Sequence, residues 1–177
     1  MEIFTPRLRL RPLCEGDIED LALLYADAEV MRSSSGLAEP RDRKGSDEWL
    51  RRTLAVPRLA SWVTFRVDDR FTGSFLGRCG LRPQEGSDET ELAYAFARAA
   101  WGRGIATEAA TAVVRHGFET GLTRIVACAL AENPASLRVL EKVGMRRTHE
   151  EATADGVLIH HAVDRDEGYL VGRLRGV

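Results

Sequence analysis

Two glycines stand two residues apart at the mouth of a predicted helix, in the segment AYAFARAAWGRGIATEAATAVVRHGFETG that covers residues 93–121. Glycine lets a backbone turn into conformations that other residues avoid, and it lets a ligand approach the chain closely. The first turn of a helix also offers unpaired N–H groups and a partial positive charge. Gly102 and Gly104, followed by the hydroxyl of Thr107, therefore predict a loop that binds phosphate.

Two common phosphate loops fit this segment poorly. A P-loop requires Gly-Lys-Ser/Thr, whereas Arg103 is followed by Gly104 and Ile105. A dinucleotide-binding loop requires a third glycine or alanine where this chain has Thr107, and an acidic residue at the end of the next strand. The apolar run at residues 123–130 ends without one. A nucleotide-dependent oxidoreductase is therefore the weakest hypothesis.

The elements that position this loop begin with a series of strands. Residues 7–11 alternate between arginine and leucine, which predicts a half-buried strand with its arginines in solvent. Pro12 limits its length. Residues 123–130 are almost continuously apolar, as in a strand buried on both faces. Further strands are predicted at residues 61–67, 74–83 and 90–96, and two or three around a turn at Asp155-Gly156.

Four helices are predicted from apolar spacing and from their capping residues. Asp17, Ser46 or Asp47, and Asn133 are the N-cap candidates, and Pro134 and Gly144 suit the start and end of the last helix. Residues 32–45 contain glycine and proline among polar residues and predict a loop. The helices cover residues 18–31, 46–56, 105–120 and 134–143.

The order of these elements predicts one α/β domain over residues 1–177. The strand–helix–strand unit from Glu91 to Leu130 requires a parallel strand pair with a right-handed crossover. The hairpins before and after it require antiparallel pairs, so the sheet is mixed.

Composition argues against several classes of protein. The 177 residues carry a net charge of −2, which provides no general field for nucleic acid. Cys14, Cys79 and Cys128 are far apart and form no Cys-x-x-Cys pair, so neither a disulfide scaffold nor a zinc site is expected, and no histidine cluster suggests a metal. No window approaches a membrane span. We expect a cytoplasmic protein that binds no nucleic acid, membrane or metal.

The segment WGRGIA resembles the pyrophosphate loop of the GNAT N-acetyltransferase superfamily, usually written Gln/Arg-x-x-Gly-x-Gly/Ala. Gly104 and Ala106 match its last two positions, and Trp101 replaces the first. That replacement is similar to the branch of ribosomal-protein N-terminal (RimJ/RimL-type) acetyltransferases. The segments TPRLRLRPL, ELAYAF and NPASLRVLEKVGM resemble other motifs of this branch in the same order, so the resemblance covers most of the chain.

The resemblance implies a fold and a co-substrate. The fold is a single-domain GNAT-like α/β (α+β) arrangement, with a mixed, mostly antiparallel twisted sheet, a central parallel strand pair and about four helices. The co-substrate is acetyl-CoA. Arg103 is equally explained as a solvated arginine, and Asn133 as a helix cap. The residues implied in binding the pyrophosphate and the pantetheine arm are Phe96, Ala97, Arg98, Gly102, Arg103, Gly104, Ile105, Ala106, Thr107 and Asn133.

The implied reaction is direct acetyl transfer to a primary amine, which needs a base, a stabilised oxyanion and a proton for the leaving thiolate. A backbone N–H near Phe96 or Ala97 is the oxyanion candidate. Leu140 occupies the position where many family members carry a tyrosine that acts as the general acid. The resemblance to this branch implies that Ser136 is the general acid instead. Glu91 is the base candidate, acting through water. Simpler explanations stay open: a first-turn polar residue for Ser136 and an exposed carboxylate for Glu91.

The acceptor is expected to be a small-molecule or peptide amine, including a protein N-terminus. Residues 33–37 occupy the position of an acceptor-binding loop, and Tyr94 is expected in the core or the wall of the acceptor groove. A second copy of the chain could pair with an exposed late strand to form a homodimer. The alternative function is a non-catalytic acyl-CoA-binding sensor. A cationic acceptor could be attracted by five acidic residues, as by any acidic rim: Glu150, Glu151, Asp164, Asp166 and Glu167.

Overall fold

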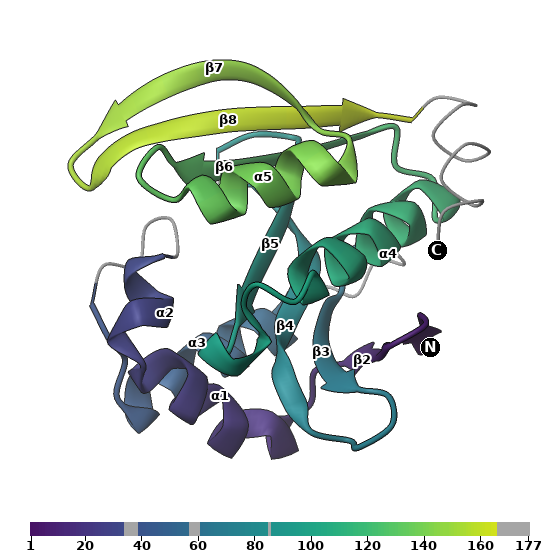
Figure 1. Ribbon diagram of the computed structural model, residues 1–177, viewed down its shortest axis with the longest axis vertical. Helices are drawn as coiled ribbons and strands as arrows, with labels where there is room; N and C mark the ends of the chain where they lie inside the picture. Colours follow the sequence, from purple (N-terminus) through teal and green to yellow (C-terminus); the bar gives the residue numbers. More distant parts are fainter. Residues whose placement is uncertain (34–38, 57–60, 85, 166–177) are drawn as a thin grey trace.

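Eight strands form one twisted sheet in the order β1-β2-β3-β4-β5-β6-β8-β7 (Figure 1). The structure is a computed structural model that describes residues 1–33, 39–56, 61–84 and 86–165. Within these described residues, β5 and β6 are the only strands that pair in parallel, which confirms the predicted mixed sheet. The strands are β1 (Ile3–Phe4), β2 (Leu8–Pro12), β3 (Thr64–Asp69), β4 (Phe75–Pro83), β5 (Thr90–Phe96), β6 (Arg124–Leu130), β7 (Arg146–Thr153) and β8 (Gly156–Asp164).

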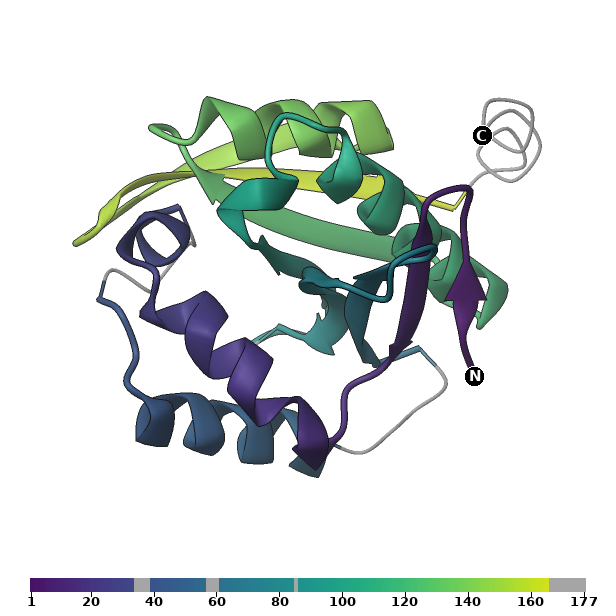
Figure 2. The same cartoon turned by 60° about the horizontal axis from the view of Figure 1, so that its bottom comes forward.

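Helices cover both faces of this sheet (Figure 2). On one face, α4 and α5 pack over the leucine and phenylalanine side chains of the strands, and on the other α1, α2 and α3 form a second apolar cluster. No described helix is both long enough and apolar enough to cross a bilayer. The α-helices are α1 (Ile18–Ala26), α2 (Ala28–Arg32), α3 (Arg43–Ala55), α4 (Ile105–Glu119) and α5 (Pro134–Val143).

The helix predicted over residues 18–31 is two helices. Asp27 has an extended conformation with ψ of 112°, and its carboxylate accepts a hydrogen bond from the N–H of Glu29 at 2.9 Å. Aspartate competes with helical hydrogen bonds in this way and so starts a new helix. Apolar spacing alone does not detect this break, because it continues from α1 into α2.

The helix predicted from residue 46 begins three residues earlier. Asp42 is its N-cap, and the Asp42 carboxylate accepts a hydrogen bond from the N–H of Gly45 at 2.7 Å. Ser46 is fully buried in the first turn rather than at the cap. Gly45 made this segment resemble a loop, whereas here the glycine follows a strong capping residue.

The parallel strands β5 and β6 are in register at one position only, where Glu91 lies opposite Val126. In contrast, all seven residues of β5 have partners on β4. Beyond Glu91 the two parallel strands diverge, and Figure 1 shows β5 running steeply away from β6. This divergence leaves space beside the second half of β5, on the side where α4 begins.

Candidate active site

The two glycines of the predicted phosphate loop both have left-handed backbone conformations. The φ angle is +71° at Gly102 and +74° at Gly104, and Gly104 is the N-cap of α4. The N–H of Glu108 donates to the carbonyl of Gly104 at 3.1 Å, as the first bond of the helix. The N–H groups of Ile105 to Thr107 precede that bond, so they have no helical acceptor. The loop therefore presents backbone donors at the positive end of α4.

The N-terminal segment fixes this loop through hydrogen bonds to Glu108 in the first turn of α4 and to the loop backbone. The Glu108 carboxylate accepts hydrogen bonds from the Thr5 hydroxyl at 2.6 Å and from Nε of Arg7 at 2.6 Å. Nη1 of Arg7 also donates to the carbonyl of Arg103 at 2.8 Å. Burial raises the pKa of Glu108, but the hydrogen bonds from Thr5 and Arg7 outweigh it, so the pKa lies below its usual value. Arg7, which the alternating pattern placed in solvent, is thus part of the loop's support.

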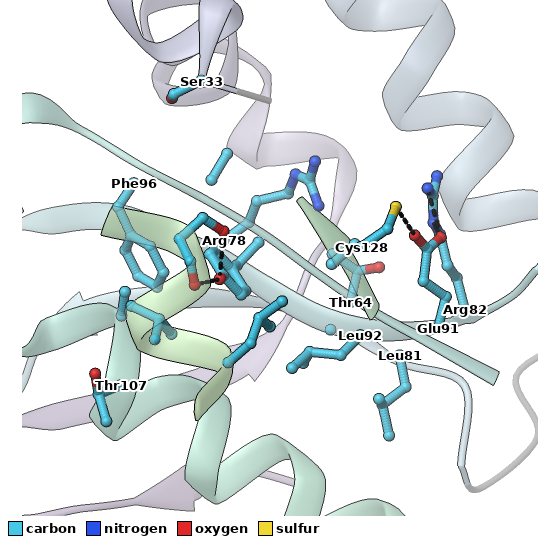
Figure 3. Close-up of a pocket in the computed structure, with 18 of the residues that line it drawn as sticks. Ser33, Thr64, Arg78, Leu81, Arg82, Glu91, Leu92, Phe96, Thr107 and Cys128 are labelled. Carbon is cyan, nitrogen blue, oxygen red and sulfur yellow. Dashed lines mark hydrogen bonds and ion pairs between the residues drawn. The ribbon is translucent and has the colours of Figure 1, made fainter. Parts of the chain in front are cut away.

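A cavity of about 850 Å³ lies against the phosphate loop, β5, α3 and α5 (Figure 3). Three predicted binding residues do not line it. Arg98 forms an ion pair with Asp27 at 2.7 Å, Nη1 of Arg103 donates to the carbonyl of Ala99, and Ala97 is absent from the lining. The predicted residues that line the cavity are Glu91, Phe96, Gly102, Gly104, Ile105, Ala106, Thr107, Asn133 and Ser136.

Ser136 and Tyr94 meet across this cavity. The Tyr94 hydroxyl and the Ser136 hydroxyl are 2.7 Å apart, and Ser136 is held in the first turn of α5. Burial raises the pKa of Tyr94 well above its usual value, so its hydroxyl keeps its proton at neutral pH. Leu140 is buried and also lines the cavity. The sequence predicted Tyr94 only as a core or groove residue, and its partnership with Ser136 was missed.

Asn133 links two elements of the site. Its Oδ1 accepts a hydrogen bond from the N–H of Ser136 at 3.0 Å, which confirms the predicted helix cap. Its Nδ2 donates to the carbonyl of Ser33 at the end of α2, at 2.7 Å. Ser33 is the first residue of the predicted acceptor loop, and the other four, 34–37, lie outside the described residues.

Glu91 is not the exposed carboxylate that its place at the start of a strand suggested. Its side chain is 12% exposed, its Oε2 accepts a hydrogen bond from Nε of Arg82 at 2.9 Å, and the same oxygen lies 2.7 Å from Nη2 of Arg82 in an ion pair. The Cys128 thiol lies 3.7 Å from Oε1. Figure 3 shows Glu91 between Arg82 and Cys128. The residue is thus the carboxylate of a partly buried ion pair at one end of the cavity.

Backbone groups near Phe96 are already used within the protein. The indole N–H of Trp101 donates to the carbonyl of Phe96 at 2.7 Å. The N–H of Ala97, one of the two predicted oxyanion donors, donates to the carbonyl of Leu76 at 2.9 Å. The tryptophan that departs from the usual loop motif therefore closes the turn between β5 and the phosphate loop.

The cavity is basic, which corrects the expectation of an acidic acceptor site. Of the predicted acidic residues, Asp164 pairs with Arg124, Glu150 with Arg147 and Glu151 with His160, and none of the three lines the cavity. Asp166 and Glu167 lie outside the described residues. Glu91 is the one carboxylate in the described lining. The basic side chains there are Arg41, Arg52, Arg78, Arg82, Arg138 and Lys142.

A glycine loop before α4, a diverging parallel strand pair and a capped α5 meet at this cavity, and a family model described as an acetyltransferase (GNAT) domain matches residues 7–146. The chain belongs to the GNAT acetyltransferase family. It is an acyltransferase, as the resemblance implied.

Relatives and solved structures agree with this membership. The uncharacterized protein YkkB of Bacillus subtilis (strain 168) is 38% identical over 148 residues, which cover 81% of this chain and 84% of that protein. The FsC-acetyl coenzyme A-N(2)-transacetylase of Aspergillus fumigatus is 30% identical, covering 84% of this chain and 66% of that protein. RimL, the ribosomal L7/L12 alpha-N-protein acetyltransferase solved with coenzyme A, has a TM-score of 0.81 at 14% identity. That alignment covers 94% of this chain and 99% of RimL, and it shows a shared fold.

Proposed function

We propose that this GNAT acyltransferase is an acetyl-CoA-dependent N-acetyltransferase that acts on a primary amine by direct transfer in a ternary complex. One observation carries the proposal: the donor-rich loop at the start of α4 and the Tyr94–Ser136 hydroxyl pair line the same cavity. The coenzyme A bound in the structure of RimL supports the choice of co-substrate.

The residues present fit a pyrophosphate and a long, thin amide-containing arm. We expect the N–H groups from Gly102 to Thr107 to bind the pyrophosphate, and the Thr107 hydroxyl to add a donor. The gap between β5 and β6 suits an extended arm that hydrogen-bonds to strand edges. The second N–H of the Asn133 side chain can donate a hydrogen bond to an amide of this arm. Bound acetyl-CoA supplies a thioester whose acetyl group is transferred.

The two catalytic candidates have separate tasks. Ser136 donates a proton to the leaving thiolate, and Tyr94 orients the serine hydroxyl through the 2.7 Å hydrogen bond between the two hydroxyl groups. Glu91 accepts the proton of the ammonium group through a water molecule, at the Oε1 atom that faces Cys128. Arg82 holds the other Glu91 oxygen and fixes the carboxylate in place.

The alternative is a non-catalytic sensor that binds acyl-CoA and transfers nothing. The test measures thermal stability with acetyl-CoA, NAD and ATP in parallel, and then thiol release from acetyl-CoA over a panel of amines. We expect stabilisation by acetyl-CoA alone and amine-dependent thiol release that falls in Ser136→Ala and Glu91→Gln. Stabilisation without amine-dependent release would favour the sensor, and stabilisation by NAD or ATP instead would refute the acetyltransferase.

We also propose that residues 1–177 form one domain that works in the cytoplasm and binds neither nucleic acid nor membrane. A homodimer that pairs through an exposed late strand stays a prediction. The strand at the sheet edge on that side is β7, whose residues are largely exposed. Light scattering of the purified protein measures the mass directly, and a monomeric mass at working concentration would exclude the dimer.

A further inference from the structure

Arg78 is a buried cation that faces the cavity without a carboxylate partner. It lies on β4 and is 7% exposed. Its Nε donates to the Tyr25 hydroxyl, and its guanidinium lies 4.8 Å from the ring centre of Trp49 and 5.8 Å from that of Tyr25. Within residues 1–33, 39–56, 61–84 and 86–165 it makes no ion pair, although it lines the cavity (Figure 3).

Burial of an unpaired charge is costly, because the charge loses its water and gains no counter-ion. Two aromatic rings recover part of that cost, and the tyrosine hydroxyl occupies only one of the five guanidinium N–H groups. The remaining donors therefore retain their capacity for an anion. A site of this kind is suited to an anionic ligand, which supplies the missing counter-ion.

Arg66 shows how the same protein treats a structural arginine. Its side chain is 12% exposed, and it pairs with Asp17 at 3.1 Å, with Asp20 at 2.5 Å and with Asp68 at 2.6 Å. Arg66 and Arg78 are direct neighbours in the β3–β4 register. Three carboxylates thus surround one arginine, and the described chain offers none to the other.

The cavity beside Arg78 has room for a small ligand on the same face of the sheet. In the β4–β5 register, Arg78 lies opposite Ala95, Gly80 opposite Ala93, and Arg82 opposite Glu91. Alternate residues of a strand share a face, so Arg78 and the Arg82–Glu91 pair lie on the same face of the sheet. The small residues beside them, Gly80, Ala93 and Ala95, form the floor of this part of the cavity. Arg78 and Arg82 are four residues apart, which corresponds to about 13 Å along the strand.

We propose that Arg78 binds a carboxylate of the acceptor, so that the substrate is a small amine that also carries a carboxylate group. The planar guanidinium fork matches the two oxygens of a carboxylate, and the other basic residues of the cavity add to the attraction. The acceptor's amine then points toward the Glu91 end of the floor. This inference rests on the proposed acetyl transfer and names its substrate class.

The test compares amines that differ only in the anionic group. The purified full chain is assayed by thiol release with ω-amino acids of two to six carbons, with their primary amides, with aminoalkylphosphonates and with neutral alkylamines. We expect kcat/KM for the best carboxylate to exceed that of its amide by about tenfold or more, since a charged hydrogen-bonded pair is lost. The length of the best amino acid reports the distance from Arg78 to the reacting amine.

Matched variants separate recognition from structure. Arg78→Met keeps the length of the side chain and removes the charge, Arg78→Lys keeps the charge and removes the fork, and Arg51→Met removes an exposed arginine on α3 outside the cavity. We expect Arg78→Met to abolish the preference for carboxylate while neutral alkylamines react at a rate within twofold of the parent. Arg78→Lys should keep part of the preference, and Arg51→Met all of it.

Several outcomes would overturn the inference. Equal rates for carboxylates and amides, or an equal loss for all amines in Arg78→Met, would make Arg78 structural. A preference for phosphonates would assign the site to a phosphoryl group instead. If no amine reacts, thermal stability of the CoA-loaded protein is measured with each pair: no added stabilisation by carboxylates over amides refutes the inference. Failure to bind acetyl-CoA at all would instead refute the proposed function.

Discussion

The hydroxyl oxygens of Tyr94 on β5 and Ser136 on α5 lie 2.7 Å apart, although 42 residues separate them in the chain. The contact exists because α5 begins beside the open side of β5, where β6 has diverged. It joins a strand that borders the proposed acyl site to a helix that borders the proposed coenzyme site. Catalysis should therefore depend on both residues, and unequally.

Ser136→Ala should lower kcat by about 100-fold, the lower range for loss of a general acid, because a thiolate is already a good leaving group. Tyr94→Phe removes only the hydroxyl that orients Ser136, so we expect a loss of about tenfold in kcat. Steady-state kinetics with saturating acetyl-CoA measures both. An unchanged kcat in Tyr94→Phe would remove tyrosine from the mechanism.

Gly104→Ala should weaken acetyl-CoA binding by at least about tenfold, because a side chain at φ of +74° strains the loop that presents the N–H donors. Gly73→Ala is the matched control, since Gly73 has φ of +72° in the β3–β4 turn with no atom near its would-be Cβ. Both should cost about 1 kcal/mol of folding stability. Equal coenzyme affinity of the two variants, measured by calorimetry, would contradict the assignment of the loop.

Glu108→Gln should destabilise the protein by about 1–2 kcal/mol at pH 7, because it loses a charge-assisted bond to Arg7. Hydrogen bonds lower the pKa of Glu108 in the folded state despite its burial. Its contribution is therefore present above its unfolded pKa and is lost as the pH falls through the folded value. Urea unfolding from pH 7 to pH 3 should show the parent and the variant converging below about pH 4.5. A constant difference would indicate a packing effect.

Alkaline pH should destabilise the protein through Cys79. Burial raises the pKa of this thiol from 9.0 to about 12, so between these values the unfolded chain has lost a proton that the folded chain retains. Each pH unit in this window should cost about 1.4 kcal/mol. Cys79→Ala should lessen the fall in stability between pH 8 and pH 10, measured by urea unfolding under reducing conditions. An identical fall in both proteins would assign it to other groups, such as Tyr94.

Arg66→Met and Arg78→Met should differ in their effect on folding. The first leaves Asp20 and Asp68 without their cation, while Asp17 keeps its ion pair with Arg11, and it should cost about 3–5 kcal/mol. The second removes a charge that the described chain does not neutralise, so it should cost about 1 kcal/mol or less. That cost arises because the Tyr25 hydroxyl loses its hydrogen-bond donor. Urea midpoints measure both, and a larger loss in Arg78→Met would mean that the arginine stabilises the fold.

The sequence allowed the phosphate loop and its helix to be predicted because their signals are local. Gly102, Gly104 and the apolar face of α4 follow one another within a few turns, and the positive φ angles explain the glycines directly. The same holds for α5, whose cap and stop residues flank it. Family resemblance added a mostly antiparallel sheet with a central parallel strand pair, whereas the full strand order comes from the structure.

The contacts of Arg7 and Arg78 could not be predicted from the sequence, because tertiary packing creates them. Arg7 alternates with leucines like any solvent-facing residue, yet its partner Glu108 is 101 residues away. Arg78 did carry a signal: it interrupts the apolar run FLGRCGL of a strand that is otherwise buried. Such an arginine must find an anion, and only the structure shows that the described chain gives it none.

The side chain of Asn133 bonds the first turn of α5 with one atom and Ser33, the first residue of the predicted acceptor loop, with another. A single amide thus connects α5, which borders the proposed coenzyme site, to the start of the predicted acceptor loop. We expect a ligand that competes for either hydrogen bond of this amide to affect both segments, so that binding of one substrate alters the place of the other. Such an arrangement favours an ordered kinetic scheme, in which the first substrate prepares the place of the second.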